Sequence, residues 1–101
     1  MDISLIIPCY NEGPYLTDNL NSIYKLFTTL TLSFEIIIIE DTSTDDTLQR
    51  VQAFAQDRPH VHMFAHESNR GRGYTVSEGI KKQRVRSSAL STLIWKLTAI
   101  T

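Results

Sequence analysis

The sequence predicts an α/β fold in which parallel strands alternate with helices. Two short and mostly apolar runs, Ile3 to Ile7 and Phe34 to Ile39, have the composition of buried strands. Between them, over residues 14–29, large apolar side chains recur every three or four positions, as they do in an amphipathic helix. Because strand–helix–strand units form right-handed crossovers, we expect a three-layer βαβ arrangement around a parallel sheet.

The rest of the alternation follows the same pattern. A second helix is expected from Thr44 to Gln56, where apolar residues fall on one face, and Pro59 then breaks it. The alternating segment His60 to Ala65 predicts a third strand. A third helix is expected from about Gly73 to Lys82, so the strands and helices continue to alternate along the chain.

Polar and aromatic residues stand where the first two strands are expected to end. Pro8 cannot donate to a sheet ladder and should end the first strand, and Tyr10 and Glu12 follow it. Glu40 and Asp41 follow the second strand. Open α/β sheets bind ligands at the carboxyl ends of their strands, so these groups should face a common crevice. There a ring could pack on a nucleobase, Asp41 could accept the imide N–H, and Glu12 could reach a ribose.

Each of these features also has a simpler explanation. The polar run from Ser43 to Asp45 would cap the next helix. For this motif taken alone, a ligand site and a simple helix start are about equally favoured. Three histidines, His60, His62 and His66, lie close together and suggest a metal. No cysteine or acid completes a zinc spacing, so a partly exposed strand face is the favoured interpretation.

Composition narrows the classes of protein. A chain of 101 residues is one domain at most, and a net charge of −1 favours neither nucleic acid nor a bulk anionic membrane as a partner. Cys9 is the sole cysteine, which suits a reducing compartment and predicts a cytoplasmic location. The apolar start is too short for a signal peptide, and no stretch approaches the ~18 apolar residues of a membrane span.

The motifs IPCYNE and IEDTSTDDT resemble the start of a family 2 glycosyltransferase with the GT-A fold. That family shows one strand ending in PxYNE and a second ending in DDxSxDxT, and Asn69 to Gly73 (NRGRG) resembles its NxGxG stretch. The resemblance covers roughly Ile3 to Gln83. It implies the N-terminal half of a Rossmann-like GT-A domain that transfers a sugar from a nucleotide-sugar donor. We expect a partial nucleotide-sugar-binding domain over residues 1–83 and a tail outside the family over 84–101.

The resemblance also implies roles for single residues. Pro8, Tyr10 and Glu12 match positions that line the nucleotide pocket of the family. Asp41 matches the second acid of an Asp-Asp pair, which contacts the base, and Ile39 stands where a relative touches the base. These residues are therefore expected to bind the nucleotide-sugar.

Further along, Arg70 and Arg72 lie near the place of the diphosphate, and guanidinium groups suit phosphate oxygens, so Arg72 joins the expected site. The chain departs from the family at Glu40, which replaces the first Asp and adds a methylene, and at Thr42, where Gly is common.

The tail departs most. Relatives hold Mg²⁺ or Mn²⁺ through an Asp-x-Asp at the end of a fourth strand, and the cation offsets charge on the leaving nucleotide. Residues 84–101 contain no Asp or Glu, so these ligands are absent. One hypothesis is a change of reading frame, since codons for STLIWKL can be chosen so that another frame encodes IDFDLEI. Without that strand we expect an open sheet edge, marginal stability and no sugar transfer by this chain alone.

The implied donor is a UDP- or GDP-sugar, and the acceptor is open, with a polyprenyl phosphate or a glycan as candidates. The family's base lies on a later segment, so no catalytic residue is assigned. Two alternatives remain: a nucleotide-binding module without catalysis, and a flavodoxin-like or receiver-type protein whose acids bind Mg²⁺. The second would need an acid pair at the tip of the first strand, and Glu12 lies four residues beyond Pro8.

Overall fold

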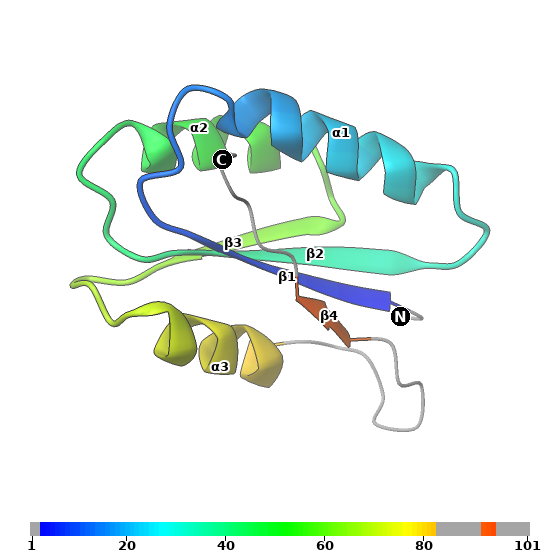
Figure 1. The fold of residues 1–101 in the computed structure, drawn as a ribbon. Coiled ribbons are helices and arrows are strands. Elements are labelled where there is room, and N and C mark those ends of the chain that lie inside the picture. The colour runs from blue at the N-terminus through cyan, green and yellow to red at the C-terminus, as the bar shows by residue number, and fades with distance from the viewer. Residues whose placement is uncertain (1–2, 83–91, 95–101) are drawn as a thin grey trace.

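The computed structural model describes residues 3–82 and 92–94. They form a parallel sheet in the order β3-β2-β1-β4, with α1 and α2 over one face and α3 over the other (Figure 1). The predicted α/β class and parallel sheet are confirmed. The elements are β1 (Ile3–Cys9), α1 (Leu16–Thr28), β2 (Phe34–Glu40), α2 (Thr47–Gln56), β3 (Val61–Ala65), α3 (Arg72–Lys82) and β4 (Thr92–Ile94).

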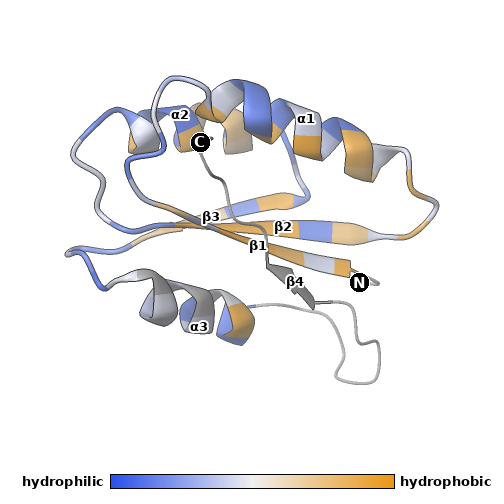
Figure 2. Cartoon of the chain, in the orientation of Figure 1, coloured by the Kyte–Doolittle hydropathy of each residue, from blue (hydrophilic) through white to orange (hydrophobic). Residues whose placement is uncertain are grey.

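The main core fills the space between the sheet and the helices α1 and α2. Side chains of a strand point alternately to the two faces, so Leu5 and Ile7 of β1 and Ile36 and Ile38 of β2 enter this core. Figure 2 shows that the strands are largely apolar, and all residues of β2 are buried, as a strand covered on both faces requires. The helix α1 adds Leu16, Leu20, Ile23 and Phe27.

The opposite face of the sheet packs against α3. Ile6 of β1 is fully buried on this face, and Gly79 of α3 lies directly against it. A Cβ on Gly79 would collide with Cγ2 of Ile6, so the missing side chain lets the helix approach the strand closely. This contact sets the distance between α3 and the sheet.

The expectation that Pro8 ends the first strand is wrong. β1 continues to Cys9, which pairs with Glu40, and the Cys9 carbonyl accepts a hydrogen bond from Asp41 N–H at 2.9 Å. Successive residues of a strand direct their backbone groups to opposite sides. The N–H that Pro8 lacks would therefore point toward β4, where the described pairing ends at Ile6.

The other boundaries differ by a few residues. α1 begins at Leu16 rather than at residue 14, and α2 begins at Thr47 rather than Thr44. The delay in α2 has a local cause, because the side chain of Asn11 accepts the N–H groups of Thr44 and Asp45 and holds them in a turn.

A fourth strand is present, so the expectation of a sheet that lacks it is wrong. Thr92–Ile94 pairs in parallel with Ser4–Ile6 at the edge of β1. Backbone pairing needs no carboxylates, so a segment without the expected acids can still add a strand. The division at residues 83 and 84 falls outside the described ranges and stays a prediction, as does the reading-frame hypothesis.

In the described ranges, no helix combines the length and the apolar character that crossing a membrane would require.

Candidate functional site

The order of the strands reverses at β1. From β1 the sheet grows through β2 to β3 with α1 and α2 on one face, whereas α3 lies on the other face and precedes β4, on the far side of β1 (Figure 1). In open α/β sheets, ligands bind beyond the carboxyl ends of the strands beside such a reversal. The fold itself therefore favours a site at the end of β1.

A pocket of about 400 Å³ opens at this place. Its volume is within the range of sites for small molecules, roughly 300–1,000 Å³. The lining combines the end of β1 and its following turn with the end of β2 and the start of α3. The residues that line it are Pro8, Cys9, Tyr10, Glu12, Asp41, Asn69, Gly71 and Thr75.

Four of the expected site residues, Pro8, Tyr10, Glu12 and Asp41, thus lie together around one pocket. Ile39 does not line the pocket: it is fully buried in β2, beside Pro8 in the strand register. Arg72 is the first residue of α3, next to the pocket residue Gly71, but its side chain is not among the parts that the structure describes.

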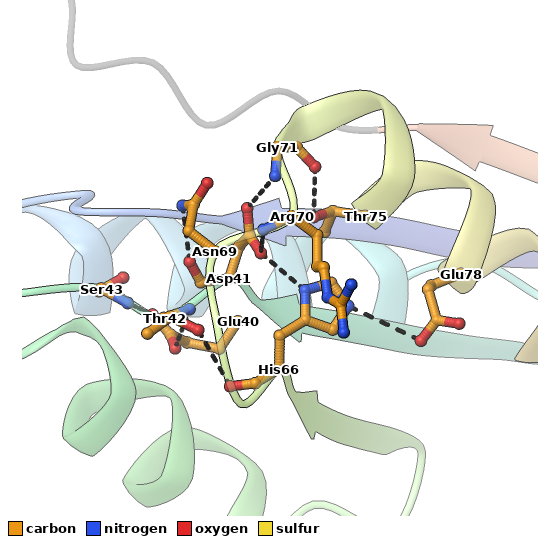
Figure 3. A network of polar contacts seen from close by, with 10 residues as sticks. All are labelled: Glu40, Asp41, Thr42, Ser43, His66, Asn69, Arg70, Gly71, Thr75 and Glu78. Carbon is orange, nitrogen blue, oxygen red and sulfur yellow. Dashed lines mark hydrogen bonds and ion pairs between the residues drawn. The ribbon is translucent and has the colours of Figure 1, made fainter.

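The carboxylate of Asp41 is the centre of a polar network (Figure 3). Its Oδ1 accepts a hydrogen bond from Arg70 N–H at 2.8 Å and lies 2.6 Å from His66 Nδ1, while its Oδ2 accepts from Gly71 N–H at 2.8 Å. Its backbone carbonyl accepts from Asn69 Nδ2 at 2.9 Å. Asp41 therefore fixes the turn Asn69–Gly71 that forms one wall of the pocket.

The electrostatics of Asp41 reflect this network. Burial raises the pKa of its carboxyl, but the hydrogen bonds from His66, Arg70 and Gly71 outweigh burial and hold the pKa below its ordinary value. Asp41 is only 3% exposed, and with this lowered pKa it is an ionised hydrogen-bond acceptor in the lining of the pocket.

Glu40 has a structural task next to the pocket. Its two carboxylate oxygens accept the N–H groups of Thr42 at 3.0 Å and Ser43 at 2.8 Å. Thr42 has a φ of 60°, a conformation that favours glycine, and its hydroxyl donates to the carbonyl of His66. These bonds compensate for the left-handed backbone, so both departures from the family pattern serve one turn.

Asn11 ties the turn after β1 to the start of α2. Its Oδ1 accepts Thr44 N–H at 2.7 Å, and its own N–H donates to Ser43 Oγ at 2.9 Å. Asp45, one position before the N-cap Asp46, accepts the N–H of Thr47, the first residue of α2. Asn11 belongs to the IPCYNE motif, but no local pattern indicates its partners, which lie more than thirty positions away.

Tyr10 and Glu12 differ in how freely they can meet a ligand. The Tyr10 side chain is half exposed at the pocket, with 47% of its surface accessible. Glu12 Oε2 accepts Tyr10 N–H at 2.9 Å, so part of the carboxylate shapes the turn that carries the tyrosine. The ring of Tyr10 is consequently available for stacking.

No cluster of metal ligands occurs among the residues that the structure describes. Within 3–82 and 92–94 no three His, Cys, Asp or Glu side chains come together as a metal group would require. Asp45 accepts a hydrogen bond from Thr47 N–H, and Asp46 forms an ion pair with Arg50. The His62 ring lies near the buried Glu35.

Comparison with known protein sequences identifies similarity to glycosyltransferases. The family model for "Glycosyl transferase family 2" matches residues 4–86. A dolichyl-phosphate beta-glucosyltransferase of Dictyostelium discoideum is 34% identical over 85 residues, which cover 77% of this chain and 26% of that protein.

Solved structures show the same similarity. Staphylococcus aureus TarS in complex with UDP superposes with a TM-score of 0.75 at 27% identity, covering 96% of this chain and 27% of that chain. A mannosyltransferase of Pyrobaculum calidifontis, solved with GDP-Man and Mn²⁺, has a TM-score of 0.68 at 22% identity, covers 81% of this chain and 24% of that chain, and supports the fold alone. The chain spans about a quarter of the length of these proteins.

Proposed function

The chain belongs to glycosyl transferase family 2, and we propose that its pocket binds the nucleotide of a nucleotide-diphosphate sugar whose sugar the whole enzyme transfers to an acceptor. The observation that carries this proposal is the convergence of Tyr10 and Asp41 on one pocket at the carboxyl ends of β1 and β2. TarS has been solved with UDP and with UDP-GlcNAc, which favours a UDP-sugar, with a GDP-sugar as the other candidate.

In this proposal the base stacks on Tyr10, whose ring is half exposed at the pocket. Asp41 Oδ2 accepts one described hydrogen bond, from Gly71, and can accept a second from the N3–H of uracil or the N1–H of guanine. Glu12 lies at the pocket, where its carboxylate would accept a hydrogen bond from a ribose hydroxyl. Pro8 forms part of the pocket wall, and Ile39, its partner in the strand register, supports it.

The diphosphate is proposed to lie toward the start of α3. The N–H groups of a helix start favour an anion, and Arg72 opens this helix. A divalent cation, Mg²⁺ or Mn²⁺, would offset charge on the leaving nucleotide, and the family's Asp-x-Asp that would hold it is missing from residues 84–101. Activation of the acceptor hydroxyl is likewise assigned to residues other than those described.

The acceptor is proposed to be a polyprenyl phosphate or a glycan, since one relative is named for a dolichyl-phosphate and another for the synthesis of poly-beta-1,6-N-acetyl-D-glucosamine. A cytoplasmic location is proposed because Cys9, the single cysteine, suits a reducing compartment.

The family match excludes the flavodoxin-like or receiver-type alternative, and β1 ends in Pro8 and Cys9 rather than in an acid pair.

Calorimetry of the 101-residue chain with UDP and GDP, with and without Mn²⁺, tests the proposal. Tyr10→Ala should weaken binding about tenfold or more, because stacking is lost, whereas Tyr10→Phe should keep most of the affinity. Tyr15→Ala is the matched control, since Tyr15 is 69% exposed and does not line the pocket. Absence of saturable binding at millimolar nucleotide would contradict the proposal.

The same titration addresses a second candidate. This candidate is a nucleotide-binding module without catalysis, which is kept because residues 84–101 contain no Asp or Glu to form the family's Asp-x-Asp. Binding that does not depend on Mn²⁺, together with no sugar transfer, would support that module. Measurable transfer by this chain would instead support a complete enzyme.

A further inference from the structure

We infer that His66 is a positioning residue of the pocket, whose imidazole fixes the Asp41 carboxylate and, through it, the turn Asn69–Gly71. The consequence for ligand binding rests on the proposed function. The arrangement of the network itself does not, because it consists of contacts within the chain.

The ring of His66 is held between carboxylates from two different elements (Figure 3). His66 directly follows β3, and its backbone N–H donates to the carbonyl of Glu40 at 2.9 Å. Its Nδ1 lies 2.6 Å from Asp41 Oδ1, and its Nε2 lies 3.7 Å from Glu78 Oε1 on α3. With a side chain only 9% exposed, the ring has little room to leave this position.

The chemistry assigns a donor role to Nδ1. An ionised carboxylate only accepts hydrogen bonds, so Nδ1 carries the proton that faces Asp41. A short bond to a charged acceptor is among the stronger kinds in proteins. The other nitrogen, Nε2, is buried and makes no hydrogen bond within the described residues, so the specific function of the ring lies in the Nδ1–H.

Asp41 passes this constraint to the pocket wall. Its Oδ1 is shared by His66 and Arg70 N–H, and its Oδ2 holds Gly71 N–H, so loss of the imidazole leaves the carboxylate held by the two backbone N–H groups alone and lets its orientation vary more. Gly71 has a φ of 85° and lines the pocket together with Asn69. A turn whose anchor is less firmly oriented would hold Gly71 less firmly at the pocket.

The residues around His66 indicate that its ring orients Asp41 and does not itself contact a ligand. The ring of Tyr74 packs on that of His66 at 5.4 Å, and Arg70 lies over Tyr74. The titratable groups that face the imidazole are Asp41, Glu78 and Tyr74. His66 does not line the pocket, so it acts on a ligand only through Asp41.

Two isosteres test the inference. The amide nitrogen of His66→Asn falls near the position of Nδ1, whereas that of His66→Gln falls near Nε2. We expect His66→Asn to bind UDP or GDP within about threefold of the unsubstituted chain, and His66→Gln and His66→Leu to bind about tenfold more weakly. A residue that only fills space would give Asn and Gln variants of equal affinity, which would overturn the inference. His60→Leu, at an exposed histidine, is the control and should bind normally.

A second measurement needs no nucleotide. Hydrogen exchange of the Arg70 and Gly71 amides, followed by NMR in the ligand-free chain, should be about tenfold faster in His66→Gln and unchanged in His66→Asn. Unchanged exchange in His66→Gln would overturn the positioning role. Faster exchange in that variant, with no nucleotide bound by the unsubstituted chain, would instead overturn the proposed function and support the role of His66.

Discussion

Gly79 of α3 and Ile6 of β1 meet so closely that a single added carbon on Gly79 would overlap Cγ2 of Ile6. Ile6 is fully buried and β-branched, so it has little freedom to move aside. The same helix begins beside Gly71 and carries the pocket residue Thr75. The contact therefore determines how far one wall of the pocket stands above the sheet.

Gly79→Ala should lower the free energy of unfolding by about 1–3 kcal/mol, the usual cost of overpacking a core. This loss should appear although alanine is the better helix former by about 1 kcal/mol. Urea denaturation followed by circular dichroism measures it. Gly73→Ala is the matched control on the same helix, because a Cβ there meets nothing within 4 Å. Equal stability of the two variants would contradict the described packing of α3.

The network at Asp41 predicts a loss of stability in acid. The folded-state pKa of Asp41 lies below its ordinary value of about 3.9, so its contribution is complete above about pH 5 and is lost as the pH falls through the folded pKa. Asp41→Asn should therefore be less stable at neutral pH and should show a shallower decline in acid. Thermal unfolding between about pH 2 and pH 7 measures this. Asp57→Asn, an exposed carboxylate at the end of α2, should keep the steep decline, and an equally steep decline in Asp41→Asn would refute the prediction.

Cys9 should be nearly inert in the folded protein. Burial, followed by the nearby carboxylates of Glu12 and Glu40, raises the pKa of its thiol well above the ordinary value, so little reactive thiolate forms. Ellman's reagent at about pH 8 should react slowly with the native chain and rapidly with the chain in guanidinium chloride. Rapid reaction of the native chain would show that the end of β1 is more open than described.

Asn11 supplies both an acceptor and an unusual backbone conformation. Its Oδ1 caps the N–H groups of Thr44 and Asp45, and its φ is 49°. Asn11→Ala removes the cap and strains the backbone, so it should cost about 1–2 kcal/mol or more, whereas Asn11→Gly should cost less because glycine tolerates this φ. Chemical denaturation of both variants checks the order. A glycine variant less stable than the alanine variant would be the contrary result.

Much of the fold could be predicted because its signals are local. The helical period over Leu16–Thr28 and the isoleucine-rich β2 identify their elements within a single stretch of chain. The meeting of Tyr10 and Asp41 followed from a general rule about the ends of parallel strands. The extent of β1 past Pro8 did not, since it depends on which side of the strand has a partner.

The partners of Asp41 could not be predicted, because they come from far along the chain. His66, Arg70 and Gly71 lie 25, 29 and 30 positions away, and no local pattern links them to a carboxylate. The NRGRG motif gave the one available signal, through Gly71 and its left-handed backbone. Sequence patterns thus located the pocket, whereas tertiary packing decides how its walls are held.

The placement of β4 beside β1 has a consequence for the order of folding. Ile3 pairs with Phe34, whereas Ser4 pairs with Thr92. The second pairing closes a much longer loop, so its cost in chain entropy is larger. During synthesis β1 leaves the ribosome first but acquires its second neighbour only after residue 92 has emerged. β1, which contributes Pro8 and Cys9 to the pocket, therefore gains its second described neighbour later than β2 does.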